Sequence, residues 1–241
     1  MNAQLIAMNG SQAGADGFLG VIMLDTRFPR PPGDIGCPQT WARAGIPVRF
    51  RTVRGASARR VVQEQDPALL GPFIDAARGL VAEGASLIST SCGFLAMWQA
   101  ELQAAVPVPV VTSSLLQAAD LPGPGIVTFD ANALGTPLLR RVGVPDGTPV
   151  EGLAQACELQ SRILSDDTVL DLAQAQQDVV AAAVRLVSRH PLVQTVVLEC
   201  TNMPPYRAAV ERATGRPVHD LETLLLDAWR RAQSSSTRRA G

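Results

Sequence analysis

The stretch Ile88-Ser-Thr-Ser-Cys92-Gly-Phe-Leu-Ala-Met-Trp98 aligns without a gap on Val196-Val-Leu-Glu-Cys200-Thr-Asn-Met-Pro-Pro-Tyr206, at an offset of 108 positions. The same offset brings Pro109-Val110 onto Pro217-Val218. Each copy reads as an apolar strand, a cysteine, a polar turn, a helix and a Pro-Val strand. A chain that builds the same thiol-bearing unit twice can direct two thiols at one bound molecule from opposite sides. That is the geometry of a two-base proton transfer.

Strand-like and helix-like segments alternate outward from this repeat. The predicted strands are 20–25, 46–53, 85–90, 108–112, 125–129, 193–199 and 217–219. The predicted helices are 67–83, 95–105, 131–142, 204–213 and a last one to about 231, with a mostly helical region over 151–189 and a polar tail at 234–239. Such alternation argues for parallel α/β architecture, in which ligands bind beyond the carboxyl ends of the strands. Both cysteines lie at that position.

Composition excludes several classes of function. The net charge is −1 and 46% of the residues are hydrophobic, so we expect neither a nucleic-acid nor a membrane partner. All 21 basic residues are arginine, which rules out a pyridoxal-phosphate lysine and a Walker-type nucleotide site. Two histidines leave little for a metal site. No Lys or Arg precedes Arg27, so we expect no secretory signal and a cytoplasmic protein with free thiols.

The environments of Cys92 and Cys200 favour catalysis over simple packing. Each is followed by a predicted helix, whose N-terminal dipole stabilises a thiolate, and each has small polar neighbours. We therefore expect at least one of the two thiols to have a pKa well below about 8.5. Cys37 and Cys157 lack such neighbours and are assigned no role.

Other polar residues also end predicted strands. Asp25 and Thr26 end the first strand and Thr128 ends the strand of the second half, so all three are candidate site residues, with a loop-capping role as the alternative for Asp25. His219-Asp220 does not indicate a hydrolase triad, because no Gly-x-Ser-x-Gly elbow accompanies it.

The segments Thr-Ser-Cys92-Gly-Phe and Glu-Cys200-Thr-Asn-Met-Pro-Pro-Tyr resemble those of the aspartate/glutamate/hydantoin racemase superfamily. The resemblance covers nearly the whole chain. It implies two pseudo-symmetric α/β lobes, each a mostly parallel sheet flanked by helices, formed by residues 1–115 plus 219–241 and by residues 116–218. It also implies an active site in the cleft between the lobes and no cofactor.

By the same resemblance Cys92 and Cys200 are the acid/base thiols that act on opposite faces of an α-carbon. The residues expected to bind the substrate are Asp25, Thr26, Arg27, Ser91, Gly93, Phe94, Thr128, Thr201 and Asn202. The chain departs from familiar glutamate racemases at Gly93-Phe94, where those carry Asn-Thr, and at Asn202, where they carry His. A distal substrate carboxylate requires an arginine, for which Arg27, Arg49 and Arg51 are the candidates.

The resulting hypothesis is a cofactor-independent amino-acid racemase of the aspartate/glutamate type, acting on a small-molecule carboxylate as a homodimer. Hydantoin racemase and maleate cis-trans isomerase activity are alternatives within the superfamily. Arylmalonate decarboxylases need only one cysteine, so two intact thiols argue against that activity. A non-catalytic small-molecule carboxylate binder is the alternative from another class.

Overall fold

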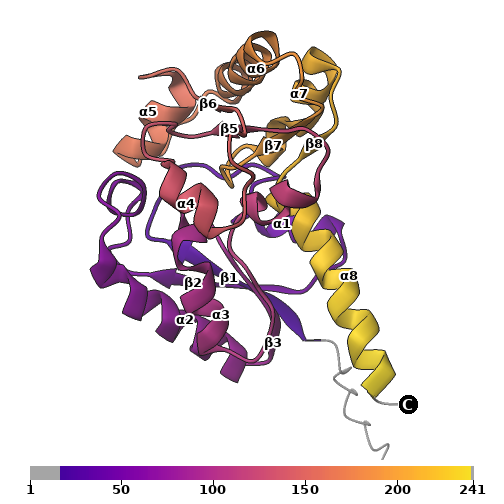
Figure 1. Cartoon of the computed structure of the whole chain (residues 1–241). Coiled ribbons are helices and arrows are strands. Elements are labelled where there is room, and N and C mark those ends of the chain that lie inside the picture. Colours follow the sequence, from indigo (N-terminus) through magenta and orange to yellow (C-terminus); the bar gives the residue numbers. More distant parts are fainter. Residues whose placement is uncertain (1–16, 240–241) are drawn as a thin grey trace, which may run out of the picture.

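Two four-stranded parallel sheets form the two halves of the molecule in the computed structural model, which describes residues 17–239 and their side chains to residue 233 (Figure 1). The first sheet has the order β2-β1-β3-β4, built from β1 (Phe18–Leu24), β2 (Val48–Val53), β3 (Ala85–Thr90) and β4 (Val110–Val111). The second has the order β6-β5-β7-β8, built from β5 (Pro124–Thr128), β6 (Val150–Gly152), β7 (Thr195–Leu198) and β8 (Val218–His219). Every strand pair is parallel. This architecture confirms the predicted fold of two α/β lobes.

The internal repeat is also visible in three dimensions. Trp98 ends the short 3₁₀ helix η3 (Gly93–Trp98), and Tyr206, 108 positions later, ends the 3₁₀ helix η5 (Pro204–Tyr206). The α-helices that follow are α3 (Gln99–Ala105) and α7 (Arg207–Thr214), and β4 and β8 come next. The two copies therefore share their order of elements as well as their residues.

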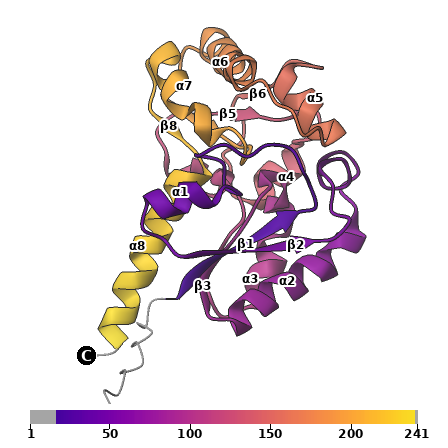
Figure 2. The same cartoon turned by 180° about the vertical axis from the view of Figure 1, so that it is seen from behind.

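Helices cover both faces of the first sheet because β1 is apolar on both sides. Leu19 and Val21 pack toward α1 (Pro38–Arg43) and α8 (Leu221–Arg239), where Leu221 and Leu225 meet them. Ile22 lies in the other cluster, with side chains of α2 (Leu70–Ala82) and α3. This alternation follows from the period of two along a strand. Figure 2 shows α1 and α8 on one side and α2 and α3 on the other.

The second lobe holds α4 (Thr136–Arg141), α5 (Glu158–Ser165), α6 (Leu172–Arg189) and α7. The apolar stripe of α6, which includes Val179, Ala183 and Leu186, is buried against its sheet. The predicted helical region from 151 is wrong at its start, where Glu151 and Gly152 belong to the three-residue strand β6. Such a short strand has too few residues to show alternation.

The ends of the chain differ from expectation as well. Helix α8 continues to Arg239, through the stretch predicted to be a polar tail, because no glycine or proline interrupts it. Residues 1–16, on which the expectation about a secretory signal rests, lie outside the described part. The lobe boundaries at 115/116 and 218/219 stay a prediction.

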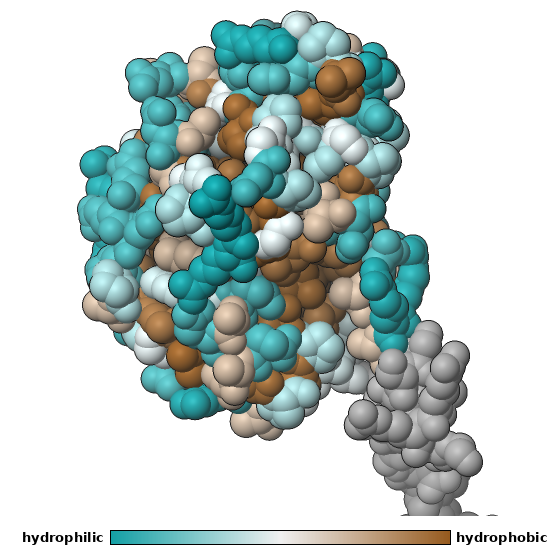
Figure 3. All heavy atoms as spheres, in the orientation of Figure 1, coloured by the Kyte–Doolittle hydropathy of each residue, from teal (hydrophilic) through white to brown (hydrophobic). Residues whose placement is uncertain are grey.

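The surface seen in Figure 3 is mostly hydrophilic over the helices, while hydrophobic side chains gather in a central area beside α8. Within residues 17–239, no helix is long and apolar enough to span a bilayer.

Candidate active site

Both repeated thiols line one small cavity between the two lobes. The first lobe contributes Leu24, Phe28, Ala58, Val62, Ser91, Cys92, Gly93 and Phe94, and the second contributes Phe129, Ile163, Glu199, Cys200, Thr201 and Asn202. The free space is about 20 Å³, room for about one water molecule. The site is therefore contracted around its thiols, and in this conformation it has no room for a molecule of substrate size.

Cys200 is tied to a buried polar network. Its Sγ donates to Oδ1 of Asn202 at 3.5 Å, and Nδ2 of Asn202 donates to Oδ2 of Asp34 at 2.6 Å. Asp34 in turn accepts from the Arg30 guanidinium at 3.0 Å, and this ion pair is nearly buried. Arg30 also donates to Oγ1 of Thr26 at 3.0 Å. The loop between β1 and α1 thus holds the neighbour of the second thiol in place.

Most hydroxyl groups beside the thiols have structural partners. Oγ1 of Thr201 donates to the carbonyl of Ser91 at 2.7 Å, which ties one cysteine turn to the other. Oγ of Ser91 accepts from the N–H of Leu24 at 2.9 Å, and Oγ1 of Thr128 donates to Oε2 of Glu199 at 2.9 Å. The predicted substrate-binding hydroxyls Thr128 and Thr201 are therefore bonded to the protein itself.

The pKa values of the thiols are raised, contrary to the prediction from the sequence. Burial and then the charge of Glu199 raise the pKa of Cys92 to about 12. Burial and the same carboxylate raise the pKa of Cys200 well above its usual value, and the Cys92 sulfur contributes too. Backbone N–H groups of Phe94 and Asn202 lower these pKa values but do not outweigh burial. The prediction failed because each thiol precedes a 3₁₀ turn in a dry cavity, rather than the open end of a long helix.

Glu199 is the site residue that the sequence analysis missed. It is completely buried at the end of β7, and burial raises its pKa to about 7, although hydrogen bonds from Thr128 and the backbone of Phe129 oppose the shift. Its Oε1 has no hydrogen-bond partner among the described residues. The sequence feature that could have identified it is a carboxylate directly after three apolar strand residues.

Four predicted substrate-binding residues, Asp25, Thr26, Arg27 and Thr128, do not line the cavity. Asp25 is exposed and accepts from the backbone N–H of Gly55 at 2.9 Å, so it holds a loop, as the capping alternative proposes. Thr26 bonds to Arg30, and the Arg27 side chain is 76% exposed. The chain turns away from the cavity after Leu24, because the N–H of Asp25 donates to the carbonyl of Ala56.

The other two arginine candidates do not line the cavity either. Arg49 and Arg51 lie on β2 and form ion pairs with Glu83 at the end of α2. No lysine or arginine is present among the described residues that line the cavity. The part of the chain from 17 to 239 also contains no group of three or more His, Cys, Asp or Glu side chains placed to hold a metal ion.

A polar clasp closes the site at one side. Oδ1 of Asp166, the residue after α5, accepts from the backbone N–H of Arg27 at 2.5 Å and of Phe28 at 3.2 Å, and Oδ2 accepts from Nε of Arg27 at 3.1 Å. Phe28 is one of the aromatic residues of the cavity wall. The clasp joins the loop after β1 to the second lobe and so holds that wall in position.

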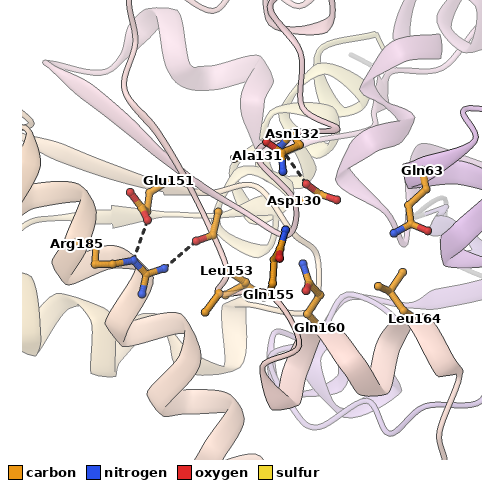
Figure 4. Close-up of a pocket in the computed structure, with 12 residues that line it drawn as sticks. Gln63, Asp130, Ala131, Asn132, Glu151, Leu153, Gln155, Gln160, Leu164 and Arg185 are labelled. Carbon is orange, nitrogen blue, oxygen red and sulfur yellow. Dashed lines mark hydrogen bonds and ion pairs between the residues drawn. The ribbon is translucent and has the colours of Figure 1, made fainter.

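A larger open hollow of about 660 Å³ lies beside the thiol cavity (Figure 4). Gln63, Asp130 and Leu164 line the hollow, and the residues directly before them, Val62, Phe129 and Ile163, line the cavity. One layer of residues therefore separates the two spaces. Figure 4 shows polar side chains directed into the hollow and Arg185 bonded to Glu151 at its rim.

The chain matches no protein-family model. It is 30% identical over 215 residues to a dimethylsulfoniopropionate lyase of Durusdinium sp. clade D, covering 84% of this chain and 70% of the relative. It is 31% identical over 225 residues to dimethylsulfoniopropionate lyase 3 of Emiliania huxleyi (strain CCMP1516), covering 84% of this chain and 56% of that protein. Across five such relatives the chain spans between 44% and 70% of their length.

Solved structures share the fold. A variant of arylmalonate decarboxylase superposes with a TM-score of 0.60 at 21% identity, covering 90% of this chain and 93% of that one. Allantoin racemase from Pseudomonas fluorescens gives a TM-score of 0.57 at 15% identity, covering 91% and 92%. Picrophilus torridus aspartate racemase gives 0.54 at 14% identity, covering 90% and 95%.

Proposed function

Because this chain belongs to the dimethylsulfoniopropionate lyase family, within the aspartate/glutamate/hydantoin racemase superfamily, we propose that it removes the α-proton of a small β-substituted carboxylate and eliminates the substituent. Dimethylsulfoniopropionate is the substrate to which the names of the relatives point. The observation that carries the proposal is a cavity in which two thiols meet an apolar, aromatic wall.

The chemistry needs one basic thiolate. The sulfur takes the α-proton, the C–H electron pair forms the double bond between the α- and β-carbons, and the bond from the β-carbon to sulfur breaks. The products are acrylate and neutral dimethyl sulfide, and the proton stays on the cysteine until it passes to solvent. The leaving group carries away no charge, so it requires no acid.

The composition of the cavity wall fits a sulfonium group better than a second carboxylate. Phe28, Phe94 and Phe129 line the cavity, and aromatic rings attract cations and also accommodate methyl groups. The Phe28 ring already holds a cation in this way, since the Arg30 guanidinium lies 4.4 Å from its centroid. The side chain of an aspartate or glutamate substrate needs a cationic partner, and none of the described lining residues is one. An onium-bearing carboxylate is therefore the better match.

A cationic substrate would also offset the raised thiol pKa values. In the contracted site both thiols are protonated at neutral pH, because burial and Glu199 disfavour a thiolate. A sulfonium charge within a few ångströms favours the thiolate and lowers its pKa. The base then forms only when the correct substrate is bound, which protects the thiol from other reactions.

The second candidate is racemisation of an α-carbon, and it is favoured by the presence of both thiols in one cavity. It shares the first step with the elimination, but a thiol on the opposite face returns a proton to the α-carbon. Hydantoin racemisation and maleate isomerisation remain variants of this candidate.

The deciding experiment incubates the protein with dimethylsulfoniopropionate in D₂O. Dimethyl sulfide is measured in the headspace by gas chromatography and acrylate by proton NMR. A panel of amino acids and hydantoins is followed in parallel for loss of the α-proton signal. We expect dimethyl sulfide and acrylate in equal amounts, and a rate at least about 100-fold lower in the double variant Cys92→Ser/Cys200→Ser.

The matched control is Cys157→Ser, since Cys157 is a free, half-buried thiol that does not line the cavity. Exchange or racemisation in the panel without dimethyl sulfide would select the second candidate. Carboxylate binding with no turnover would indicate a binding protein. Full lyase activity in the double variant would overturn the thiol mechanism.

A further inference from the structure

We propose that Glu199 is a third catalytic residue of this site, and that its protonated carboxyl group donates a hydrogen bond from Oε1 to the carboxylate of the bound substrate. The inference rests on the carboxylate chemistry proposed above, and it holds for any leaving group.

The geometry of Glu199 leaves one oxygen for a ligand. Oε2 is occupied by the hydroxyl of Thr128 at 2.9 Å, whereas Oε1 is fully buried and has no partner among the described residues. The residue lines the cavity between the two cysteine turns. It lies so close to Gly93 that a Cβ there would stand 2.2 Å from Oε1. Buried polar atoms are rarely left unpaired, so Oε1 is expected to gain its partner from bound substrate.

The charges around Glu199 favour its neutral form once a carboxylate binds. Cys92 and Cys200 face it from the two cysteine turns, and both are acids. Arg30, a cation in the surrounding network, is paired with Asp34, whose carboxylate offsets most of its charge. A substrate carboxylate therefore meets an uncompensated carboxylate in a dry cavity, and one of the two takes a proton. Glu199 takes it readily, because burial already raises its pKa to about 7.

A protonated Glu199 adds a donor to a site in which most side-chain donors are already committed. The hydroxyls of Thr128 and Thr201 are bonded within the protein, and the amide of Asn202 is bonded to Asp34. When the α-proton leaves, negative charge builds on the substrate carboxylate, and a carboxylic acid aimed at it stabilises that charge. A buried acid held neutral at physiological pH is an established way to provide such a donor.

Binding of a non-reacting carboxylate tests the inference without turnover. 4-Methylpentanoate has the shape of dimethylsulfoniopropionate, with carbon in place of the sulfonium. If Glu199 must be protonated, affinity falls as pH rises above about 7, roughly tenfold from pH 6 to 8 and tenfold again to pH 9. Calorimetry at pH 8 in buffers of different ionisation enthalpy should show uptake of nearly one proton per ligand. The thiols do not interfere, since their pKa values lie far higher.

Glu199→Gln keeps the shape and the donor but cannot ionise. We expect this variant to bind 4-methylpentanoate about equally from pH 6 to 9 without proton uptake, and to lose the same pH dependence from kcat/KM. Glu83→Gln, which removes a surface carboxylate on α2, is the matched control and should behave like the wild type.

Three results would overturn the inference: no binding of 4-methylpentanoate at pH 6, binding without proton uptake in the wild type, or unchanged proton uptake in Glu199→Gln. The wild-type measurement is informative even if the variant does not fold. Proton-linked binding in a protein without lyase activity would retain the role of Glu199 and reject the lyase function. Lyase activity without proton-linked binding would retain the lyase function and reject the role of Glu199.

Discussion

Replacing Gly93 with alanine tests the close contact on which the site depends. The added Cβ would lie 2.2 Å from Oε1 of Glu199 and 2.3 Å from its carbonyl oxygen, whereas ordinary contacts begin at 3.4 Å. Residue 93 or the backbone of Glu199 must therefore move by about 1.1 Å. The carboxyl group alone cannot solve the clash, because the carbonyl belongs to a backbone whose N–H is bonded to Val127 at 2.8 Å.

Two losses are expected from Gly93→Ala. Overpacking of this kind costs on the order of 1–3 kcal/mol of unfolding free energy, measured by urea denaturation. A shift of about 1 Å between the first thiol and the carboxylate is expected to lower kcat/KM roughly 100-fold. The control is Gly71→Ala on α2, where a Cβ meets nothing within 4 Å, and where stability should change by less than about 1 kcal/mol with full activity.

The reasoning would be refuted by a Gly93→Ala variant within about 0.5 kcal/mol of the wild type and within twofold in kcat/KM. Loss of stability with normal activity would show that the contact is structural only. Loss of activity at full stability would show that the Glu199 side chain shifts without cost in unfolding free energy, while the backbone stays in place.

Two further predictions concern the neighbours of Glu199 and the clasp. Thr128→Val removes a hydrogen bond that lowers the pKa of Glu199, so the pH midpoint of 4-methylpentanoate binding should rise by up to about one unit, while Thr128→Ser should restore it. Asp166→Gly keeps the left-handed backbone at φ 53° but releases Phe28, so a thiol reagent should modify the cavity roughly 5- to 30-fold faster. The control is Asp167→Ala, because the Asp167 carboxylate pairs with Arg162 of α5 within the second lobe. This variant should change the modification rate less than twofold, and equal rates in the two variants would contradict the role of the clasp.

The sequence predicts the frame of the site because the frame follows from local rules. Apolar strands followed by helices give a parallel sheet, and the carboxyl ends of its strands meet at one edge. The repeat then indicates that Cys92 and Cys200 occupy equivalent positions in two such sheets. These arguments need only spacing and hydrophobic pattern, and both thiols do line one cavity.

The direction of the chain beyond a strand does not follow from such rules. Asp25 ends a strand at the correct edge, but a backbone bond to Ala56 turns it toward solvent. The apolar wall comes from Val62, Phe129 and Ile163, which belong to three separate segments and meet only through packing of the two lobes. No local pattern marks such residues as neighbours.

The repeat contains an asymmetry that bears on which thiol is the base. The offset of 108 places Ser91 before Cys92 where Glu199 precedes Cys200. Arg30 lowers the pKa of Cys92, whereas Asp34 and Cys92 raise that of Cys200, whose Sγ also donates to Asn202.

Cys92 is thus the easier of the two to ionise, and Cys200 is held as a thiol. A lyase needs one base, so Cys92→Ser should abolish elimination while Cys200→Ser retains at least about a tenth of it. A racemase needs both thiols and would lose activity equally in the two variants. Equal loss of dimethyl sulfide formation would therefore reject the assignment of Cys92 as the single base, because the asymmetry around the thiols would then have no kinetic consequence.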